Sequence, residues 1–356
     1  MSPLPIDPAV LKQSIRDWGH TLGFQQIGVC DIDLAAAEQH LHEWLNAGFH
    51  GEMIYMARHG VRRSRPAELL PGTVRVISAR MDYLPEGRAE ILARLDEPGK
   101  AFISRYALGR DYHKLLRNRL QALAKRIEAA IGPFGYRVFT DSAPVMEKPL
   151  AEKSGLGWIG KHTNLINRYA GSFFFLGEIY TDLPLPVDVP LQNHCRSCTA
   201  CLSICPTQAI VAPYRLDARR CIAYLTIELH GPIPEEFRAA MGNRIYGCDD
   251  CQLVCPWNQY AQLTREVDFL PRHSLDAAGL IELFLWDEAT FLANTEGSAI
   301  RRIGHESWLR NIAVALGNQA PAPGVVDALR VRAAHPSECV REHVSWALSR
   351  QAGERL

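Results

Sequence analysis

Two patterns of apolar residues alternate along the first half of the chain. Apolar residues at steps of three and four, which share one face of a helix, predict helices over 8–22, 34–47 and 115–131. Short apolar runs predict strands over 26–30, 74–79, 136–140 and 173–180. This alternation of helix and strand up to about residue 185 predicts an α/β domain, although the pattern does not set the order of the strands.

The pattern changes after a proline-rich stretch at 184–190. Eight of the ten cysteines lie within 195–256 in short, turn-rich sequence, and the chain beyond this stretch has helical periodicity. Residues 308–317 resemble residues 340–349 at an offset of 32, which predicts a pair of HEAT-like helical repeats. We therefore expect an α/β domain, a small cysteine-rich module and a helical domain, over 1–187, 188–262 and 263–356 respectively.

The composition is that of a globular protein, with 356 residues, 47% of them hydrophobic, and 39 basic side chains against 39 acidic ones. No run approaches a membrane span, and the N-terminus lacks the basic and apolar regions of a secretion signal. These features predict a cytoplasmic protein without a membrane partner. The stretch 58–126 holds 16 basic and 7 acidic residues, which predicts either a face that attracts phosphates or a solvated surface balanced by acidic neighbours.

The cysteine spacing is typical of proteins that bind two iron–sulfur clusters. The run C-x2-C-x2-C-x3-C-P at 195–206 matches the bacterial ferredoxin motif, in which the fourth cysteine serves the other cluster. A second run at 248–256 and the isolated Cys221 complete eight thiolates, the number that two 4Fe-4S clusters need. Crossed ligation assigns one cluster to Cys195, Cys198, Cys201 and Cys255, and the other to Cys205, Cys221, Cys248 and Cys251.

Zinc and disulfides are the alternatives for these cysteines. Zinc ribbons pair two C-x2-C units across a longer stretch, which is not the spacing of this chain. The lack of a secretion signal disfavours disulfides. Cys30 and Cys339 stand apart from both runs, and we expect them to be small buried hydrophobic residues.

Two clusters in one module indicate electron transfer to a group held elsewhere in the chain. The N-terminal domain has neither a G-x-G-x-x-G fingerprint nor a Walker P-loop. Its most distinctive segment, 141–166, begins with Asp141 shortly before a proline. Taken alone, Asp141 favours a helix cap over a catalytic residue, and the glycines of this segment predict either turns or close approach to a bound group.

Four blocks of the chain resemble one family. They are HGEMIYMAR at 50–58, ISRYALGRDYH at 103–113, the segment DSAPVMEKPLAEKSGLGWIGKHTNLI at 141–166 and the two cysteine runs. In these blocks the chain resembles the epoxyqueuosine reductases, which complete the synthesis of the tRNA nucleoside queuosine. The resemblance extends over essentially the whole chain. It implies a core like that of reductive dehalogenases and nitroreductases with base-off cobalamin, a ferredoxin-like double-cluster module and C-terminal HEAT-like repeats.

The reaction that the resemblance implies removes the epoxide oxygen of epoxyqueuosine at the wobble position of a tRNA with a GUN anticodon. It leaves an alkene and consumes two electrons and two protons. The implied partners are this tRNA and an external low-potential electron donor, and the implied state is a monomer. Asp141 is the family's proposed proton donor, and for this role we expect desolvation and the absence of a nearby cation to raise its pKa.

The matching blocks also imply which residues contact cobalamin. They are Arg58, Ser104, Arg105, Asp141, Lys161, Thr163, Asn164 and Leu165, the last through its backbone. Two other functions stay open from the residues themselves: a cobalamin-dependent reductase of a small molecule, similar to a dehalogenase, and a two-cluster electron carrier without a reaction of its own.

For the tRNA, we expect contacts from the basic stretch of the N-terminal half. The candidates are Arg58, Arg62, Arg63, Arg65, Lys114, Arg117, Arg119, Lys125 and Arg126. The helical C-terminal segment is nearly neutral, so it would hold tRNA only if Arg301, Arg302 and Arg310 cluster on its surface.

Overall fold

The N-terminal part of the protein is built on a four-stranded sheet, in a computed structural model that describes residues 6–95 and 97–353. The strand order is β1 (Gln26–Cys30), β2 (Arg75–Asp82), β7 (Phe174–Thr181) and β4 (Tyr136–Phe139). Every neighbouring pair is antiparallel, and Ala79 of β2 lies opposite Ile27 on one side and Gly177 on the other. The apolar pattern predicted all four strands but not their antiparallel pairing.

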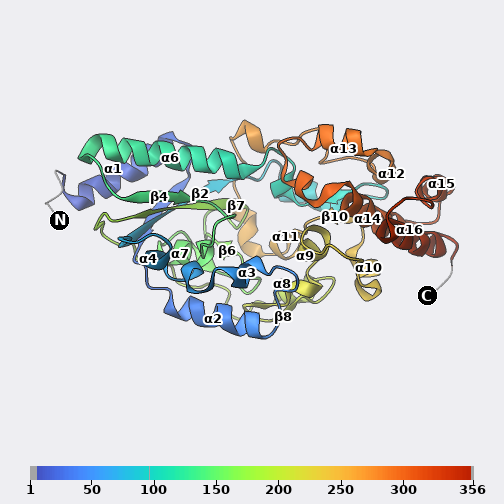
Figure 1. The fold of residues 1–356 in the computed structure, drawn as a ribbon, viewed down its shortest axis with the longest axis horizontal. Coiled ribbons are helices and arrows are strands. Elements are labelled where there is room, and N and C mark those ends of the chain that lie inside the picture. The colour runs from blue at the N-terminus through green and yellow to red at the C-terminus, as the bar shows by residue number, and fades with distance from the viewer. Residues whose placement is uncertain (1–5, 96, 354–356) are drawn as a thin grey trace.

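Helices cover both faces of this sheet (Figure 1). The helices α1 (Pro8–Thr21) and α6 (Tyr112–Ile131) pack on one face, and α7 (Glu147–Lys153) packs on the other. Asp7 caps α1, because its carboxylate accepts the N–H groups of Ala9 and Val10 at 2.8 and 3.2 Å. The buried apolar faces of α1 and α6 meet the sheet in one core, as their periodicity predicted.

Shorter elements connect these helices and strands. They are α2 (Ala35–Asn46), α3 (Tyr55–Arg58), η1 (Gly60–Arg63), α4 (Pro66–Leu69), α5 (Arg88–Leu95), β3 (Phe102–Ile103), η2 (Arg105–Ala107), β5 (Trp158–Ile159) and β6 (Leu165–Ile166). Of these, the apolar pattern predicted α2 only, because most of the others are too short to show a period.

The cysteine-rich module consists of short elements. They are α8 (Ala200–Ile204), β8 (Ile210–Ala212), β9 (Arg215–Leu216), η3 (Ala218–Arg220), α9 (Ile222–Ile227), α10 (Glu235–Met241), β10 (Arg244–Tyr246), α11 (Asp250–Leu253) and η4 (Pro256–Tyr260). The strand β10 pairs in parallel with β3, with Arg244 opposite Phe102 and Tyr246 opposite Ile103. Backbone hydrogen bonds therefore tie the module to the N-terminal part.

Helices make up most of the C-terminal part (Figure 1). The elements are η5 (Val267–Phe269), α12 (Leu280–Leu285), α13 (Glu288–Asn294), η6 (Ala299–Ile303), α14 (Gly304–Gly317), α15 (Pro323–Val331) and α16 (Glu338–Gln351). The two similar segments, 308–317 and 340–349, lie in α14 and α16, which pack against each other. One hydrophobic core joins α14 to Ile103 of β3 and to Leu225 and Ile245 of the cysteine-rich module.

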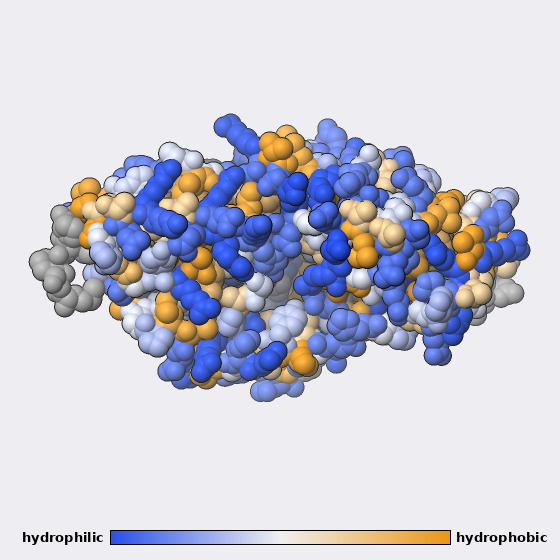
Figure 2. Space-filling model, turned by 45° about the horizontal axis from the view of Figure 1, so that its top comes forward, coloured by the Kyte–Doolittle hydropathy of each residue, from blue (hydrophilic) through white to orange (hydrophobic). Residues whose placement is uncertain are grey.

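The surface is mainly polar on the face that Figure 2 shows, with hydrophobic residues scattered among hydrophilic ones and a hollow near the middle. Within the described residues, no helix is both long enough and apolar enough to cross a membrane.

Arg310 links α14 to the cysteine-rich module. Its side chain is buried, and its guanidinium donates hydrogen bonds to the backbone carbonyls of Leu225, Leu229 and Gly231 at 2.7–2.9 Å. Burial lowers the pKa of Arg310 to about 10, which still leaves it charged at neutral pH. Because the Arg310 side chain is buried and bonded to these carbonyls, it cannot contact tRNA at the surface. The surface cluster of Arg301, Arg302 and Arg310 that tRNA binding would need therefore does not form.

This link predicts a large loss of stability when Arg310 is replaced. Arg310→Met keeps an unbranched side chain but leaves three buried carbonyls without their donors, so we expect the free energy of unfolding to fall by about 3 kcal/mol or more. Urea denaturation followed by circular dichroism measures it. Arg330→Met is the control, because Arg330 is 70% exposed, and it should change stability by less than about 0.5 kcal/mol. An equally small change for Arg310→Met would contradict the account.

Candidate active site and cluster sites

The structure gathers the eight candidate cysteines into two sets of four. The outer set lines a cavity of about 250 Å³ and consists of Cys195, Cys198, Cys201 and Cys255, of which Cys198 is exposed. The inner set lines a cavity of about 280 Å³ and consists of Cys205, Cys221, Cys248 and Cys251, none of them exposed. This is the division that crossed ligation predicts, because Cys201 and Cys205 lie near opposite ends of α8 and reach different cavities.

The chemistry of both sets fits iron–sulfur clusters. In the described part of the chain, no three His, Cys, Asp or Glu side chains converge as a single metal ion would need. Burial raises the pKa values of the Cys248 and Cys251 thiols well above the ordinary value. A nearby positive charge, such as that of iron, would stabilise their thiolate forms. The backbone N–H of Ala209 already donates to Sγ of Cys205 at 3.2 Å. The buried Nε2 of His162, which lines both cavities, has no partner among the described residues and suits a cluster sulfur.

The inner cavity continues into two neighbouring spaces that reach Asp141. These have volumes of about 280 and 600 Å³, and Tyr106 and Lys148 line all three. We call this joined space the central cavity. Its walls combine α7 and the loop after β4 with Tyr246 of the cysteine-rich module and Arg302 of η6. Segments far apart in the sequence therefore build one site.

Five of the eight predicted cobalamin contacts lie in the wall of the central cavity. Ser104, Thr163 and Asn164 stand at the end that holds the inner cysteines. Leu165 and Asp141 line the adjoining space.

The structure places the other three predicted contacts outside this wall. Arg58 is exposed on α3. Arg105 is 1% exposed and its Nε lies 3.0 Å from Glu86 Oε1, so it faces the interior of the fold. Lys161 lines the outer cavity, where its Nζ donates to the backbone carbonyls of Arg196 and Cys198 at 2.6 and 2.8 Å.

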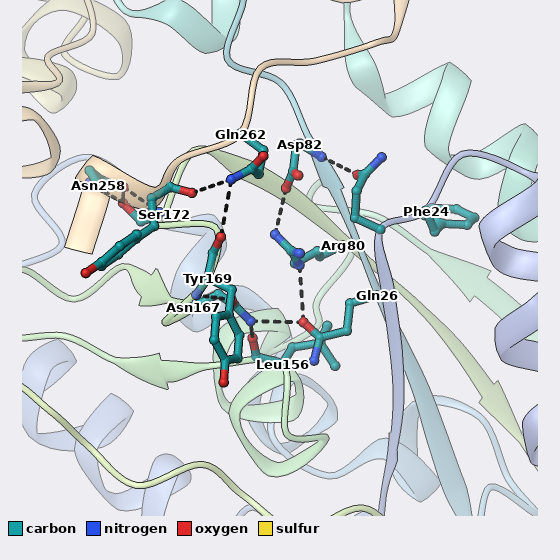
Figure 3. Close-up of polar contacts among 12 residues, drawn as sticks. Phe24, Gln26, Arg80, Asp82, Leu156, Asn167, Tyr169, Ser172, Asn258 and Gln262 are labelled. Carbon is teal, nitrogen blue, oxygen red and sulfur yellow. Dashed lines mark hydrogen bonds and ion pairs between the residues drawn. The ribbon is translucent and has the colours of Figure 1, made fainter. Parts of the chain in front are cut away.

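A polar network fixes the part of the wall that β6 provides (Figure 3). Asn167, which follows β6, donates to Oε1 of Gln26 at 3.0 Å, and Arg80 donates to the same oxygen at 3.2 Å. Farther along the chain, the N–H of Ser172 donates to Oδ1 of Asn258 at 2.6 Å. The network therefore anchors this wall both to the sheet and to the cysteine-rich module.

Asp141 is held through its side chain and through its backbone. Its Oδ2 lies 3.2 Å from Nε2 of His113, whose Nδ1 lies 2.5 Å from Oδ1 of Asp111. Its backbone N–H donates to Oε1 of Glu147 at 2.6 Å. The backbone is left-handed, with a φ of +33°, a conformation that is uncommon for residues other than glycine. The side chain is 53% exposed, which lets it meet a ligand.

The pKa values of His113 and Asp141 determine which of the two groups holds the proton between them. Burial alone would lower the pKa of His113, but hydrogen bonds with Asp111 and Asp141 raise it to about 9. Burial would raise the pKa of Asp141, yet hydrogen bonds from His113 and Tyr112 bring it below its ordinary value. The expectation of a raised pKa without a nearby cation is therefore wrong. These shifts favour an imidazolium paired with a carboxylate at neutral pH, with the proton on His113.

The helix-cap interpretation of Asp141 is also wrong. The helix α7 begins at Glu147 and is preceded by Met146, so Asp141 lies outside it. The strained loop instead carries the Asp141 side chain to the central cavity.

Sequence reasoning missed several residues of the site. His113 and Lys148 lie inside the blocks 103–113 and 141–166, so their signal was present but unassigned. Arg302 was considered only as part of a surface cluster for tRNA, and the structure puts it in the cavity wall, paired with Glu228. Only the fold shows that placement, because η6 is distant in the sequence from the rest of the site.

Fewer of the predicted basic residues are available to bind tRNA than the sequence suggested. Arg63 is buried, and it donates to the backbone carbonyls of Tyr55 and Met56. Arg65 and Arg119 are paired with acidic residues. The remaining candidates are exposed and form no ion pair with any described residue: Arg58, Arg62, Lys114, Arg117, Lys125 and Arg126.

Comparisons with known sequences agree with this arrangement. Residues 194–258 match the family described as "4Fe-4S double cluster binding domain", and residues 63–142 match "Epoxyqueuosine reductase QueG, DUF1730". The chain is 63% identical over 347 residues to the epoxyqueuosine reductase of Pseudomonas aeruginosa, which covers 97% of this chain and 96% of that protein. It is 59% identical over 352 residues to that of Escherichia coli K12, with 99% and 92% covered.

The fold is similar to that of solved epoxyqueuosine reductases. One was crystallised with an epoxyqueuosine-modified tRNA-Tyr stem loop, and it shares 26% identity at a TM-score of 0.87 over 97% of this chain and 91% of that chain. The Streptococcus thermophilus enzyme shares 25% identity at a TM-score of 0.83 over the same shares of the two chains. Since its relatives match it at high identity over nearly its whole length, the chain belongs to the epoxyqueuosine reductase family.

Proposed function

We propose that this oxidoreductase reduces epoxyqueuosine to queuosine at the wobble position of a tRNA with a GUN anticodon. The observation that carries the proposal is the central cavity, which joins the inner set of cysteines to Asp141. The names of relatives at 58% and 63% identity favour this reaction over reduction of a small molecule or electron transfer alone.

The two cysteine sets define a direction for electron flow. The outer set includes the exposed Cys198, so a cluster held there would be open to an external low-potential donor. The inner set lies in the wall of the central cavity, so its four cysteines would hold a cluster beside the group bound in that cavity. Two such clusters would supply electrons one at a time.

We infer that the central cavity holds cobalamin in its base-off form. When bound, cobalamin supplies a strongly reducing cobalt centre. Ser104, Thr163 and Asn164 line the cavity and would offer hydroxyl and amide groups to its peripheral amides, and Leu165 would add its backbone. Arg105 lies outside the wall, and we assign it an indirect role. Its backbone N–H donates to Asp249, which also accepts a hydrogen bond from the hydroxyl of Ser104 at 2.5 Å, so Arg105 helps to position Ser104.

Lys161 and Arg58 have separate roles in this proposal. Lys161 shapes the outer loop through its two hydrogen bonds to backbone carbonyls. Arg58 is exposed and unpaired among the described residues, so we assign it to tRNA instead of cobalamin.

Asp141 is the proposed proton donor, supplied by His113. As the epoxide oxygen departs, the proton on Nε2 of His113 moves through the carboxylate of Asp141 to that oxygen. Asp111 stabilises the charged ring before transfer and fixes its orientation.

We further propose that the segments 1–187, 188–262 and 263–356 are the functional divisions of the chain, with HEAT-like repeats in the last. The packing of α14 on α16 supports such a repeat. The protein would act as a monomer in the cytoplasm.

The role of Asp141 predicts a specific loss of turnover. Asp141→Asn keeps the shape but cannot pass a proton, so queuosine formation should fall by about 100-fold or more. Iron content and cobalamin binding should stay at the wild-type level, measured by metal analysis and anaerobic spectroscopy. Asp17→Asn on α1 is the control and should keep full turnover. An Asp141→Asn enzyme within about twofold of wild type would refute the role.

The raised pKa of His113 predicts how its contribution to stability depends on pH. A histidine whose folded pKa is about 9 against an ordinary 6.5 stabilises the fold fully below about pH 6.5 and loses that effect as pH rises through about 9. The difference in unfolding free energy between wild type and His113→Gln should therefore shrink over this range in urea titrations. A difference that is constant from pH 6 to about pH 9.5 would show that folding does not raise the pKa of His113.

The exposed basic residues predict salt-dependent binding of tRNA. Affinity for the anticodon stem loop should fall steeply as salt rises, because phosphate contacts release counterions. Arg62→Ala combined with Arg117→Ala should weaken binding and reduce the salt slope by about 1 for each phosphate that is no longer neutralised. Filter binding at several salt concentrations measures this, with Arg330→Ala as the control. A salt-independent affinity would argue against a phosphate-dominated interface.

A further inference from the structure

Two buried glutamates lie behind Asp141. Glu178 stands in the middle of β7, opposite Ser78 of β2 and Phe139 of β4, and it is fully buried. Its carboxyl lies beside that of Glu147, the first residue of α7. Both carboxyl oxygens of Glu178 are buried and have no hydrogen-bond partner among the described residues. Because two adjacent carboxylates repel strongly where water is excluded, the pair retains a proton.

Glu147 connects this pair to the loop that carries Asp141. Its Oε1 accepts the backbone N–H of Asp141 at 2.6 Å, whereas His113 holds only the side chain. The left-handed backbone of Asp141 is an unfavourable conformation that persists only where its surroundings impose it. Glu147 supplies that restraint on the main chain, and it also lines the central cavity.

Several titratable groups surround the two glutamates, and their pKa values decide which group loses a proton near neutral pH. The titratable groups that face them are Asp141, His113, Tyr112, Lys148, Tyr180 and Cys30. Burial and the charge of Asp141 raise the pKa of Glu147 to about 8, and burial raises that of Glu178 well above its ordinary value. Burial also raises the pKa of Tyr180 above its ordinary value and that of Cys30 to about 11, so these two stay neutral.

We propose that Glu147, which shares a proton with the buried Glu178, is a positioning residue that latches the Asp141 loop against the central cavity. With the proton present, Glu178 donates to Glu147 and Glu147 accepts the N–H of Asp141. Loss of the proton places two charges side by side in the interior and releases the latch. The latch is a property of the free protein, and only its consequence for turnover rests on the proposed function.

Hydrogen–deuterium exchange of the free, full-length protein tests the latch directly. Glu147→Met keeps an unbranched side chain but removes the acceptor, so exchange in the peptide that spans 141–146 should become about tenfold faster. Glu282→Met on α12 is the matched control, because Glu282 is exposed and lies outside the walls of the central cavity, and it should leave this peptide unchanged. Equal exchange in Glu147→Met and wild type would overturn the latch.

The pH dependence of exchange distinguishes a shared proton from a purely structural role of Glu178. Glu178→Gln still donates to Glu147 through its amide but has no proton to lose. We therefore expect wild-type exchange to accelerate above about pH 8 beyond the ordinary base-catalysed rise, and Glu178→Gln to follow the ordinary rise only. Identical pH profiles for the two proteins would overturn the shared proton, and this arm stays informative if Glu147→Met does not fold.

Turnover separates this inference from the proposed function. A released loop should lower kcat about tenfold in Glu147→Met and leave KM for tRNA within about twofold, because the loop orients a proton donor instead of binding the substrate. Glu147→Gln keeps an acceptor oxygen and should recover most of the lost kcat. Faster exchange together with unchanged kcat would keep the latch and refute the role of Asp141 in turnover.

Discussion

The arrangement of the site depends on one electrostatic requirement: a carboxylate must keep its charge at the wall of a cavity, where partial burial disfavours the charged form. Asp141 meets this requirement through the imidazolium of His113, which is itself held by Asp111. In the proposed reaction the same contact would also keep a proton within reach of the departing oxygen, so that one interaction would serve charge compensation and proton supply. The remaining features of the site set where this pair stands relative to the inner cysteines.

That position is set by contacts between segments that are distant in the sequence. The strand pair β3–β10 joins the N-terminal part to the cysteine-rich module, and Arg310 joins the module to α14. The polar network around Asn167 ties β6 to the sheet. These contacts fix the inner cysteines and Asp141 in the walls of one cavity, which is what the proposed coupling of electron and proton transfer requires.

Local sequence signals predicted the long elements and the ligand sets. The helices α1 and α6 bury one face each and show the period of that burial, and the cysteine spacing alone divides the eight thiols as the structure does. The resemblance to the reductases pointed to Asp141, Ser104 and Asn164, all of which line the central cavity. These features are readable because each depends on residues close together in the chain.

The features that sequence reasoning missed depend on tertiary contacts. Nothing near Arg310 in the sequence indicates that three carbonyls of the module receive its guanidinium. The pKa of Asp141 is lowered by His113, which is 28 residues away, so the expected direction was wrong. Arg302 reaches the cavity only because α14 packs on the module. Charge and burial are properties of the assembled fold, and short sequence windows do not contain them.

The central claim is that the cavity between the inner cysteines and Asp141 uses cobalamin to reduce epoxyqueuosine in tRNA. The most direct measurement is a single-turnover reaction of the reconstituted protein under anaerobic conditions, with and without cobalamin, followed by nucleoside analysis of the tRNA. The account predicts about eight irons per chain, a base-off cobalamin signal in electron paramagnetic resonance, and queuosine only when cobalamin is present. Eight irons without bound cobalamin, or queuosine formed in its absence, would contradict it.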